Sequence, residues 1–306
     1  MTKPRIELEK VRNFGELFDV VIQFTKQEIK PILLSLSYLL PFALIATVFE
    51  VWFRSEMQFN LLSIFRKNPQ DIFSSFISWK IFIMYFFKFL VYIVSILIIN
   101  SYLVLYNNRI RKSPKPTEVI QTSLINLGGA FGVFIITLMV LAVAFLILIG
   151  LIFIMPMGSI FWIIIFLLIF LYLAIGASLS YISLIHNKGG AFSSIIHSFD
   201  LIKENWFLAF AFMFLFNLII SFAQSGLGFP RAILSMILTF TSMKEEASLL
   251  QKILYQALTA VEVFLGYFLS IIGNIAVGVY YFYTLEKQEA PGLTRKINLL
   301  RNRGIE

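Results

Sequence analysis

Two ionisable side chains, Lys88 and Glu262, occur within long apolar runs of this 306-residue sequence. A charged group inside a bilayer is costly, so each such residue is a candidate for a functional site. We predict that both runs are entered from the same side of a membrane, which makes an ion pair between Lys88 and Glu262 possible. The alternatives are snorkelling to the interface or a structural tie between helices. Glu50, near Trp52, is either an interface anchor or the partner of Lys88 instead.

Three amides, Asn100, Asn217 and Asn274, complete the predicted intramembrane polar site. Neutral amides in apolar helices commonly form hydrogen bonds between helices. We expect that role for all three amides, with participation in a binding site as the alternative.

The sequence contains no pattern typical of a known catalytic or metal centre. Gly176-Ala-Ser178 is similar to the Gly-x-Ser of intramembrane serine proteases, whose chemistry needs a histidine at membrane depth. The only two histidines, His186 and His197, are predicted to lie together on the cytoplasmic side. Metal-ligand spacing and a P-loop are also missing, as is cysteine. We therefore expect no enzymatic activity, cofactor or metal.

Composition indicates which elements hold these residues. The chain is 59% hydrophobic and only 14% charged, with a mean hydropathy of +0.86, whereas soluble domains carry about 25% charged residues. Within lipid, backbone groups must pair inside their own segment, so the apolar runs are predicted to be helices. The net charge of +8 comes without a nucleic-acid-binding motif, and we predict no nucleic-acid partner.

We predict an all-α integral membrane protein made of one polytopic domain with six transmembrane helices in three hairpins. The helices are expected at about residues 31–53, 79–106, 130–154, 160–185, 206–222 and 257–283. Pro41 should kink the first helix, and QSGLGFP at 224–230 should break the chain after the fifth. Residues 224–256 then form either a re-entrant or an extracytoplasmic helical segment.

Lysine and arginine are concentrated in alternate connections. Most of the 25 lie in the amphipathic arm 1–30, the connections 107–129 and 186–205, and the basic tail 284–306. Cytoplasmic loops carry such an excess. We therefore predict that both termini are cytoplasmic.

An amphipathic segment precedes each predicted hairpin. The three segments are ELFDVVIQFTKQ, EVIQTSLINL and SIIHSFDLIKEN, and each has apolar residues at helical spacing. We predict interfacial helices on the cytoplasmic face and a threefold internal repeat. The alternative is that any short loop before a span tends to be amphipathic.

One of these regions resembles a known family. AFSSIIHSFDLIKENWFLAF at 191–210 is similar to the signature of the membrane domain attached to some bacterial glycerophosphoryl diester phosphodiesterases, and of related stand-alone multispan proteins. FGELFDVVIQFTKQEIKPILL resembles the entry helix of that family, and VYYFYTLEKQEAPGL resembles its closing motif. The resemblance implies a six-span accessory-type protein of the bacterial inner membrane. The paired acids and histidines of the phosphodiesterase do not occur, so its activity is not implied.

The sequence leaves two functions open. We expect a non-enzymatic accessory or scaffold module whose surface helices bind membrane lipids, or other membrane proteins as partners. The alternative is a transporter of small solutes or lipids with a mid-membrane polar site near Lys88, Glu262 and Asn274.

Overall fold

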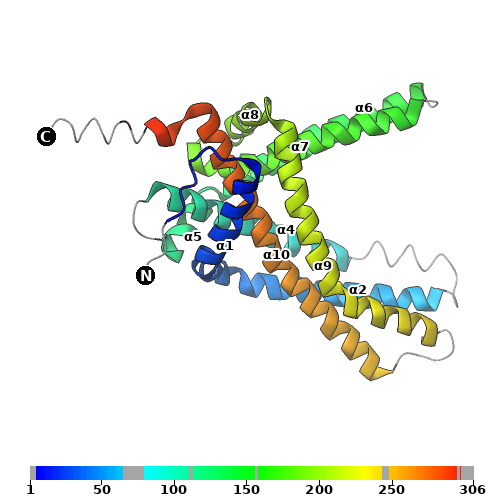
Figure 1. Cartoon of the computed structure of the whole chain (residues 1–306). Helices are drawn as coiled ribbons and strands as arrows, with labels where there is room; N and C mark the ends of the chain where they lie inside the picture. Colours follow the sequence, from blue (N-terminus) through cyan, green and yellow to red (C-terminus); the bar gives the residue numbers. More distant parts are fainter. Residues whose placement is uncertain are drawn as a thin grey trace. The chain divides into compact units, whose positions relative to one another are not determined.

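The computed structural model describes residues 5–64, 79–109, 113–155, 158–242, 248–294 and 297, and the secondary structure within these ranges is entirely helical. The helices are α1 (Phe14–Leu36), the 3₁₀ turn η1 (Ser37–Leu39), α2 (Leu40–Ile64), α4 (Trp79–Asn108), α5 (Pro116–Ile125), α6 (Leu127–Ile154), α7 (Ser159–Asn187), α8 (Ala191–Ile202), α9 (Trp206–Ser242) and α10 (Leu249–Glu289). Figure 1 shows them in chain order from blue to red.

Six helices of the described chain are long and apolar enough to cross a membrane. They are Phe14–Gln58, Ile81–Asn108, Leu127–Ile154, Ile160–Asn187, Trp206–Phe240 and Leu249–Glu289. The first combines α1, η1 and most of α2. The prediction of an all-α fold with six such helices is confirmed.

The first of these helices is interrupted by the 3₁₀ turn η1 just before Pro41. A proline cannot donate to the carbonyl four residues earlier, which here belongs to Ser37. The N–H of Leu40 bonds to that carbonyl instead, in the tighter 3₁₀ pattern. Pro41 then occupies the first turn of α2, where its missing donor costs little. Pro31, where the span was predicted to begin, lies inside α1, so residues 14–36 form one helix.

The predicted break at 224–230 is wrong, because α9 continues from Trp206 to Ser242 with Pro230 inside it. Pro230 removes one hydrogen bond to Gly226. A full break would leave several more backbone groups without partners, which is the larger cost in apolar surroundings. The described parts of 224–256 are therefore continuations of α9 and α10, and the fifth and sixth helices are longer than predicted.

The chain forms two compact units. Unit 1 comprises Met1–Ser35, Ile96–Phe216 and Gly273–Glu306, and unit 2 comprises Leu36–Ser95 and Asn217–Ile272. A single membrane domain remains a prediction.

In unit 1, α8 packs against both α6 and α7 (Figure 1). Small residues allow the close approach. A side-chain carbon at Gly132 would lie 2.9 Å from that of Ala191, and one at Gly176 would overlap the ring of Phe199. The two glycines therefore allow α8 to lie close to the backbones of α6 and α7.

The apolar face of α1 is covered by protein. Leu17, Val21 and Phe24 are fully buried. The ring of Phe18 stacks on Phe216 of α9, with centroids 4.5 Å apart. The sequence predicted that this face lies on lipid headgroups, but in unit 1 it packs against other helices.

The beginning of the basic tail 284–306 is also packed against protein. Residues 284–289 are the last turns of α10, and Leu285 and Glu286 are buried. The carboxylate of Glu286 accepts hydrogen bonds from the backbone N–H groups of Gly292 and Leu293. These bonds hold the chain that follows against the end of the helix.

Unit 2 has its own apolar core. Ala43, Ala46 and Val91 are buried together, and the rings of Phe87 and Tyr267 pack against them. Small side chains on α2 bring it close to α4, which places the polar residues further along both helices within reach of one another.

Candidate functional sites

Five charged side chains of unit 2 form one connected group, which we call the ion cluster. Its members are Glu50, Arg54, Lys88, Arg231 and Glu262. The Lys88 ammonium lies 3.0 Å from Glu50, and Arg54 lies 2.6 Å from Glu50 and 3.1 Å from Glu262. Arg231 binds Glu262 through two of its nitrogens. The cluster therefore links four helices, α2, α4, α9 and α10.

The structure assigns Lys88 and Glu262 to one cluster but gives them different partners. Within the described residues, Lys88 pairs with Glu50, which was one of the two roles considered for that carboxylate. Glu262 pairs with Arg54 and Arg231. The two predicted residues are connected only through Glu50 and Arg54.

Local sequence explains how the cluster is positioned. Glu50 and Arg54 are four residues apart on α2, so they share a face of that helix. On α9, Gly228 precedes Arg231 by about one turn. A side-chain carbon at Gly228 would lie 3.2 Å from the carboxyl carbon of Glu262. Glycine therefore gives this carboxylate room to reach the α9 backbone and meet Arg231.

The carboxylates are buried more deeply than the cations. The side chains of Glu50 and Glu262 are 5% and 17% exposed, whereas those of Arg54, Lys88 and Arg231 are 34%, 35% and 24% exposed. Every carboxylate oxygen accepts from at least one cation. The cluster therefore offers positive charge to its surroundings.

Two of the three predicted amides lie in a different unit from the ion cluster. Asn100 and Asn274 lie in unit 1, whereas Asn217 is the first residue of the α9 segment in unit 2. Asn100 is 2% exposed, and its side-chain oxygen has no hydrogen-bond partner among the described residues. Asn217 and Asn274 both interact with other residues.

Arg54 and Arg231 are the cluster residues that sequence reasoning missed. Arg54 could have been found from its spacing to Glu50 at the end of an apolar run. Arg231 follows the Gly-Pro sequence that we interpreted as a helix break, so its position on a long apolar helix was not apparent.

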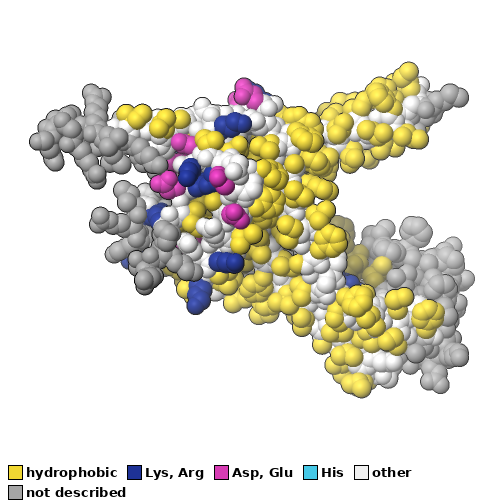
Figure 2. Space-filling model, in the orientation of Figure 1, with side chains coloured by type: hydrophobic (Ala, Val, Ile, Leu, Met, Phe, Trp, Pro, Cys, Tyr) yellow, Lys and Arg dark blue, Asp and Glu magenta, His cyan; other side chains and the backbone are white. Residues whose placement is uncertain are grey.

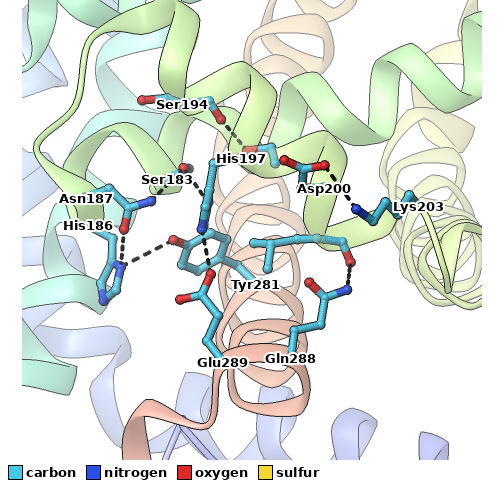
Figure 3. A network of polar contacts seen from close by, with 12 residues as sticks. Ser183, His186, Asn187, Ser194, His197, Asp200, Lys203, Tyr281, Gln288 and Glu289 are labelled. Carbon is cyan, nitrogen blue, oxygen red and sulfur yellow. Dashed lines mark hydrogen bonds and ion pairs between the residues drawn. The ribbon is translucent and has the colours of Figure 1, made fainter.

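A second polar network lies in unit 1, where α8 meets α7 and α10 (Figure 3). His197 of α8 lies between Ser183 of α7, at 3.1 Å, and Glu289 of α10, at 3.0 Å. The side-chain amide of Gln288 donates to the backbone carbonyl of Leu201 at 2.9 Å. His186 contacts the Tyr281 hydroxyl at 3.3 Å. The contacts of His197 and Gln288 connect α8 to α7 and α10.

Helix α8 has a buried side and an exposed side. Ser194, Ser198 and Leu201 are buried against protein. Ser193 and Asp200 are exposed and polar, and Asp200 pairs with Lys203 at 3.3 Å. The same exposed side carries two large apolar side chains, Phe192 at 67% and Ile196 at 48%.

Charged side chains are unevenly distributed on the face of the molecule in Figure 2. Within unit 1, they gather over the end that carries α1 and α8, whereas the far part of the α6–α7 pair is covered with hydrophobic side chains. Helix α8 therefore lies where polar and apolar surfaces of this unit meet.

Among the described residues, no group of three or more His, Cys, Asp or Glu side chains could hold a metal ion. Comparisons with protein families, with curated proteins and with solved structures find no match to the chain. The fold itself defines the class, which is a multi-pass, all-α membrane protein.

Proposed function

We propose that this chain is a non-enzymatic accessory protein of the bacterial cytoplasmic membrane that binds lipids through its surface helices, chiefly α8. The observation that carries the proposal is the pair of large apolar side chains, Phe192 and Ile196, which are exposed one turn apart beside polar residues of the same helix. A helix with this exposed side is suited to the boundary between headgroups and acyl chains.

The energetics favour lipid against these two side chains. Burying a Phe or Ile side chain fully is worth about 1.5–3 kcal/mol, so covering the exposed parts of both yields on the order of 2–3 kcal/mol. The network around His197 holds α8 in place, so little ordering is needed on binding. Lys188, Lys203 and Lys287 are exposed around the same region, and each adds about 1 kcal/mol near an anionic surface.

The arrangement of charges supports a cytoplasmic position for α8 and for both termini. Lysine and arginine are concentrated in the segments that flank α1, α5, α8 and the end of α10. The resemblance of residues 191–210 to the phosphodiesterase-associated membrane domains also supports an accessory role in a bacterial inner membrane.

Single-cysteine labelling tests the proposal, because the chain contains no cysteine. Ile196→Cys and Ser193→Cys carry the same environment-sensitive fluorophore at an apolar and a polar exposed position of α8. In nanodiscs, we expect nitroxide-labelled lipid to quench the label at position 196, and aqueous iodide to quench the label at 193. Equal access of iodide to both positions would show that the apolar position does not meet lipid.

Transport of a small solute or lipid is the second candidate, and the ion cluster on four apolar helices is the observation that favours it. Reconstituted proteoliposomes would then take up substrate, and Lys88→Ala and Glu262→Ala would abolish uptake while leaving assembly intact. If Lys88→Ala and Glu262→Ala lower only the stability of the protein, the result favours the accessory function.

A further inference from the structure

The surplus of cations in the ion cluster requires an explanation beyond helix pairing. Three cations surround two carboxylates, so the formal charge of the group is +1. A group of charges at the edge of apolar helices is least costly when its charges balance. An anion bound against the exposed side of the cluster would supply that balance.

The cations also keep donors that the cluster does not use. Lys88 makes one ion pair, Arg54 makes two, and Arg231 binds Glu262. Guanidinium and ammonium groups carry more N–H donors than these contacts occupy. Among the described residues, no further acceptor reaches Arg54 or Lys88. The carboxylate oxygens, in contrast, are all occupied, which disfavours a bound cation.

Helix length sets the ion cluster about one bilayer thickness away from Asn107 and Trp206. Roughly 28 Å of helix separates Lys88 from Asn107 on α4, and roughly 37 Å separates Arg231 from Trp206 on α9. The hydrocarbon core of a bilayer is about 30 Å thick. If Asn107 and Trp206 mark the cytoplasmic interface, the cluster reaches the opposite one.

The residues next to the cluster fit the same level. Trp52 lies between Glu50 and Arg54 in sequence, and Phe229 lies two residues before Arg231. Both rings are exposed. Tryptophan is enriched where headgroups meet acyl chains. Both rings would contact the acyl chain of a lipid whose headgroup lies against the cations.

We propose that Arg54, Lys88 and Arg231 form a binding site for a phosphate-bearing anion, with Glu50 and Glu262 holding the cations in place behind it. Arginine and lysine both bind phosphate through charge-assisted hydrogen bonds. The proposal is independent of lipid binding by α8, which lies in the other unit.

The test follows thermal unfolding of the full chain in an uncharged detergent, with three probes: short-chain phosphatidylglycerol, phosphatidylcholine of the same chain length, and inorganic phosphate. Phosphatidylglycerol should raise the midpoint of the wild-type protein, and phosphatidylcholine should not. If inorganic phosphate also stabilises the protein, the site accepts the free anion; if only phosphatidylglycerol does, the site needs a lipid headgroup.

Variants of Lys88 test whether stabilisation by phosphatidylglycerol depends on the ion cluster. Lys88→Gln should require at least about tenfold more phosphatidylglycerol for the same stabilisation, because one charged contact is lost. Lys88→Arg and the control Lys252→Gln, which changes a cation elsewhere on α10, should respond like the wild type. An equal response of Lys88→Gln and wild type overturns the proposal. The proposal is also overturned if phosphatidylglycerol and phosphatidylcholine raise the unfolding midpoint of the wild type equally. This comparison does not depend on the folding of any variant.

Discussion

Replacing Glu262 with Gln tests how the ion cluster stabilises unit 2. The glutamine has nearly the same shape but no charge, so Arg54 and Arg231 lose the carboxylate that they share. A hydrogen bond to a charged group is worth about 1.5–3 kcal/mol. The two arginines are 34% and 24% exposed, so solvent screening reduces the sum to about 2–3 kcal/mol.

That loss should be visible in thermal unfolding. For a large domain, about 1 kcal/mol corresponds to a shift of roughly 2 °C in Tm, so Glu262→Gln should unfold about 4–6 °C below the wild type. Asp200→Asn is the matched control, because Asp200 pairs with Lys203 at 3.3 Å and both side chains are mostly exposed. An exposed pair of this kind contributes less than about 1 kcal/mol, so the control should shift by no more than about 2 °C.

A double-mutant cycle separates the pair from its surroundings. Arg231→Gln alone leaves Glu262 with Arg54, and the double variant Glu262→Gln with Arg231→Gln removes the interaction from both sides. If the two side chains act on each other, the double variant is less destabilised than the sum of the single variants, by about 1–2 kcal/mol. Strict additivity, or an unchanged Tm for Glu262→Gln, would refute the stabilising role of the cluster.

Two further perturbations concern single contacts. Gly228→Val should lower the free energy of unfolding by about 1–3 kcal/mol, because its side chain would collide with Glu262. Gly226→Ala, with open space around it, should stabilise α9 by up to about 1 kcal/mol in the same assay; equal effects would contradict this reasoning. Arg109→Ala should raise the pKa of Glu118, which a hydrogen bond from Arg109 now holds below its ordinary value. Because that pKa is lowered, the stabilising contribution of Glu118 is present above the ordinary carboxyl pKa and is lost as pH falls through the lowered one. A carbon-detected NMR titration of Glu118 measures the change, and an unaltered pKa would rule out the assigned cause.

The helices that could be predicted well are those with uniform composition. Helices α4, α6 and α7 begin and end within three residues of the predicted spans 79–106, 130–154 and 160–185. Each is a long apolar run bounded by polar residues or a turn. In such a run, the requirement for internal backbone pairing leaves no competing structure.

Prediction failed where glycine and proline were interpreted locally. QSGLGFP reads as a break because Pro230 removes a donor and the glycines disfavour a helix. The role of Gly228 depends on a residue far along the chain, because this glycine leaves room for the carboxylate of Glu262. The segment is a packing feature of α9 and α10, and nothing within its own seven residues indicates this.

The candidate site could be predicted only in part for a related reason. Lys88 and Glu262 stand out because each is a charge in an apolar run, which is a property of the local sequence. Their partners depend on which helices are neighbours. Arg231 lay in a segment assigned outside the spans, and Asn100 and Asn274 lie in the other unit from the charges they were grouped with.

The amphipathic segments also show that the local sequence does not determine which surface a helix packs against. Residues 14–27 and 191–203 have similar periodicity, and the threefold repeat that links them stays a prediction. In the structure, the apolar face of α1 packs against other helices, and the ring of Phe18 stacks on that of Phe216. Helix α8 instead buries its small and aliphatic residues and exposes Phe192 and Ile196. Periodicity therefore identifies an apolar face but not what covers it. Of the two helices, α8 is the one that exposes two large apolar side chains one turn apart for lipid to cover.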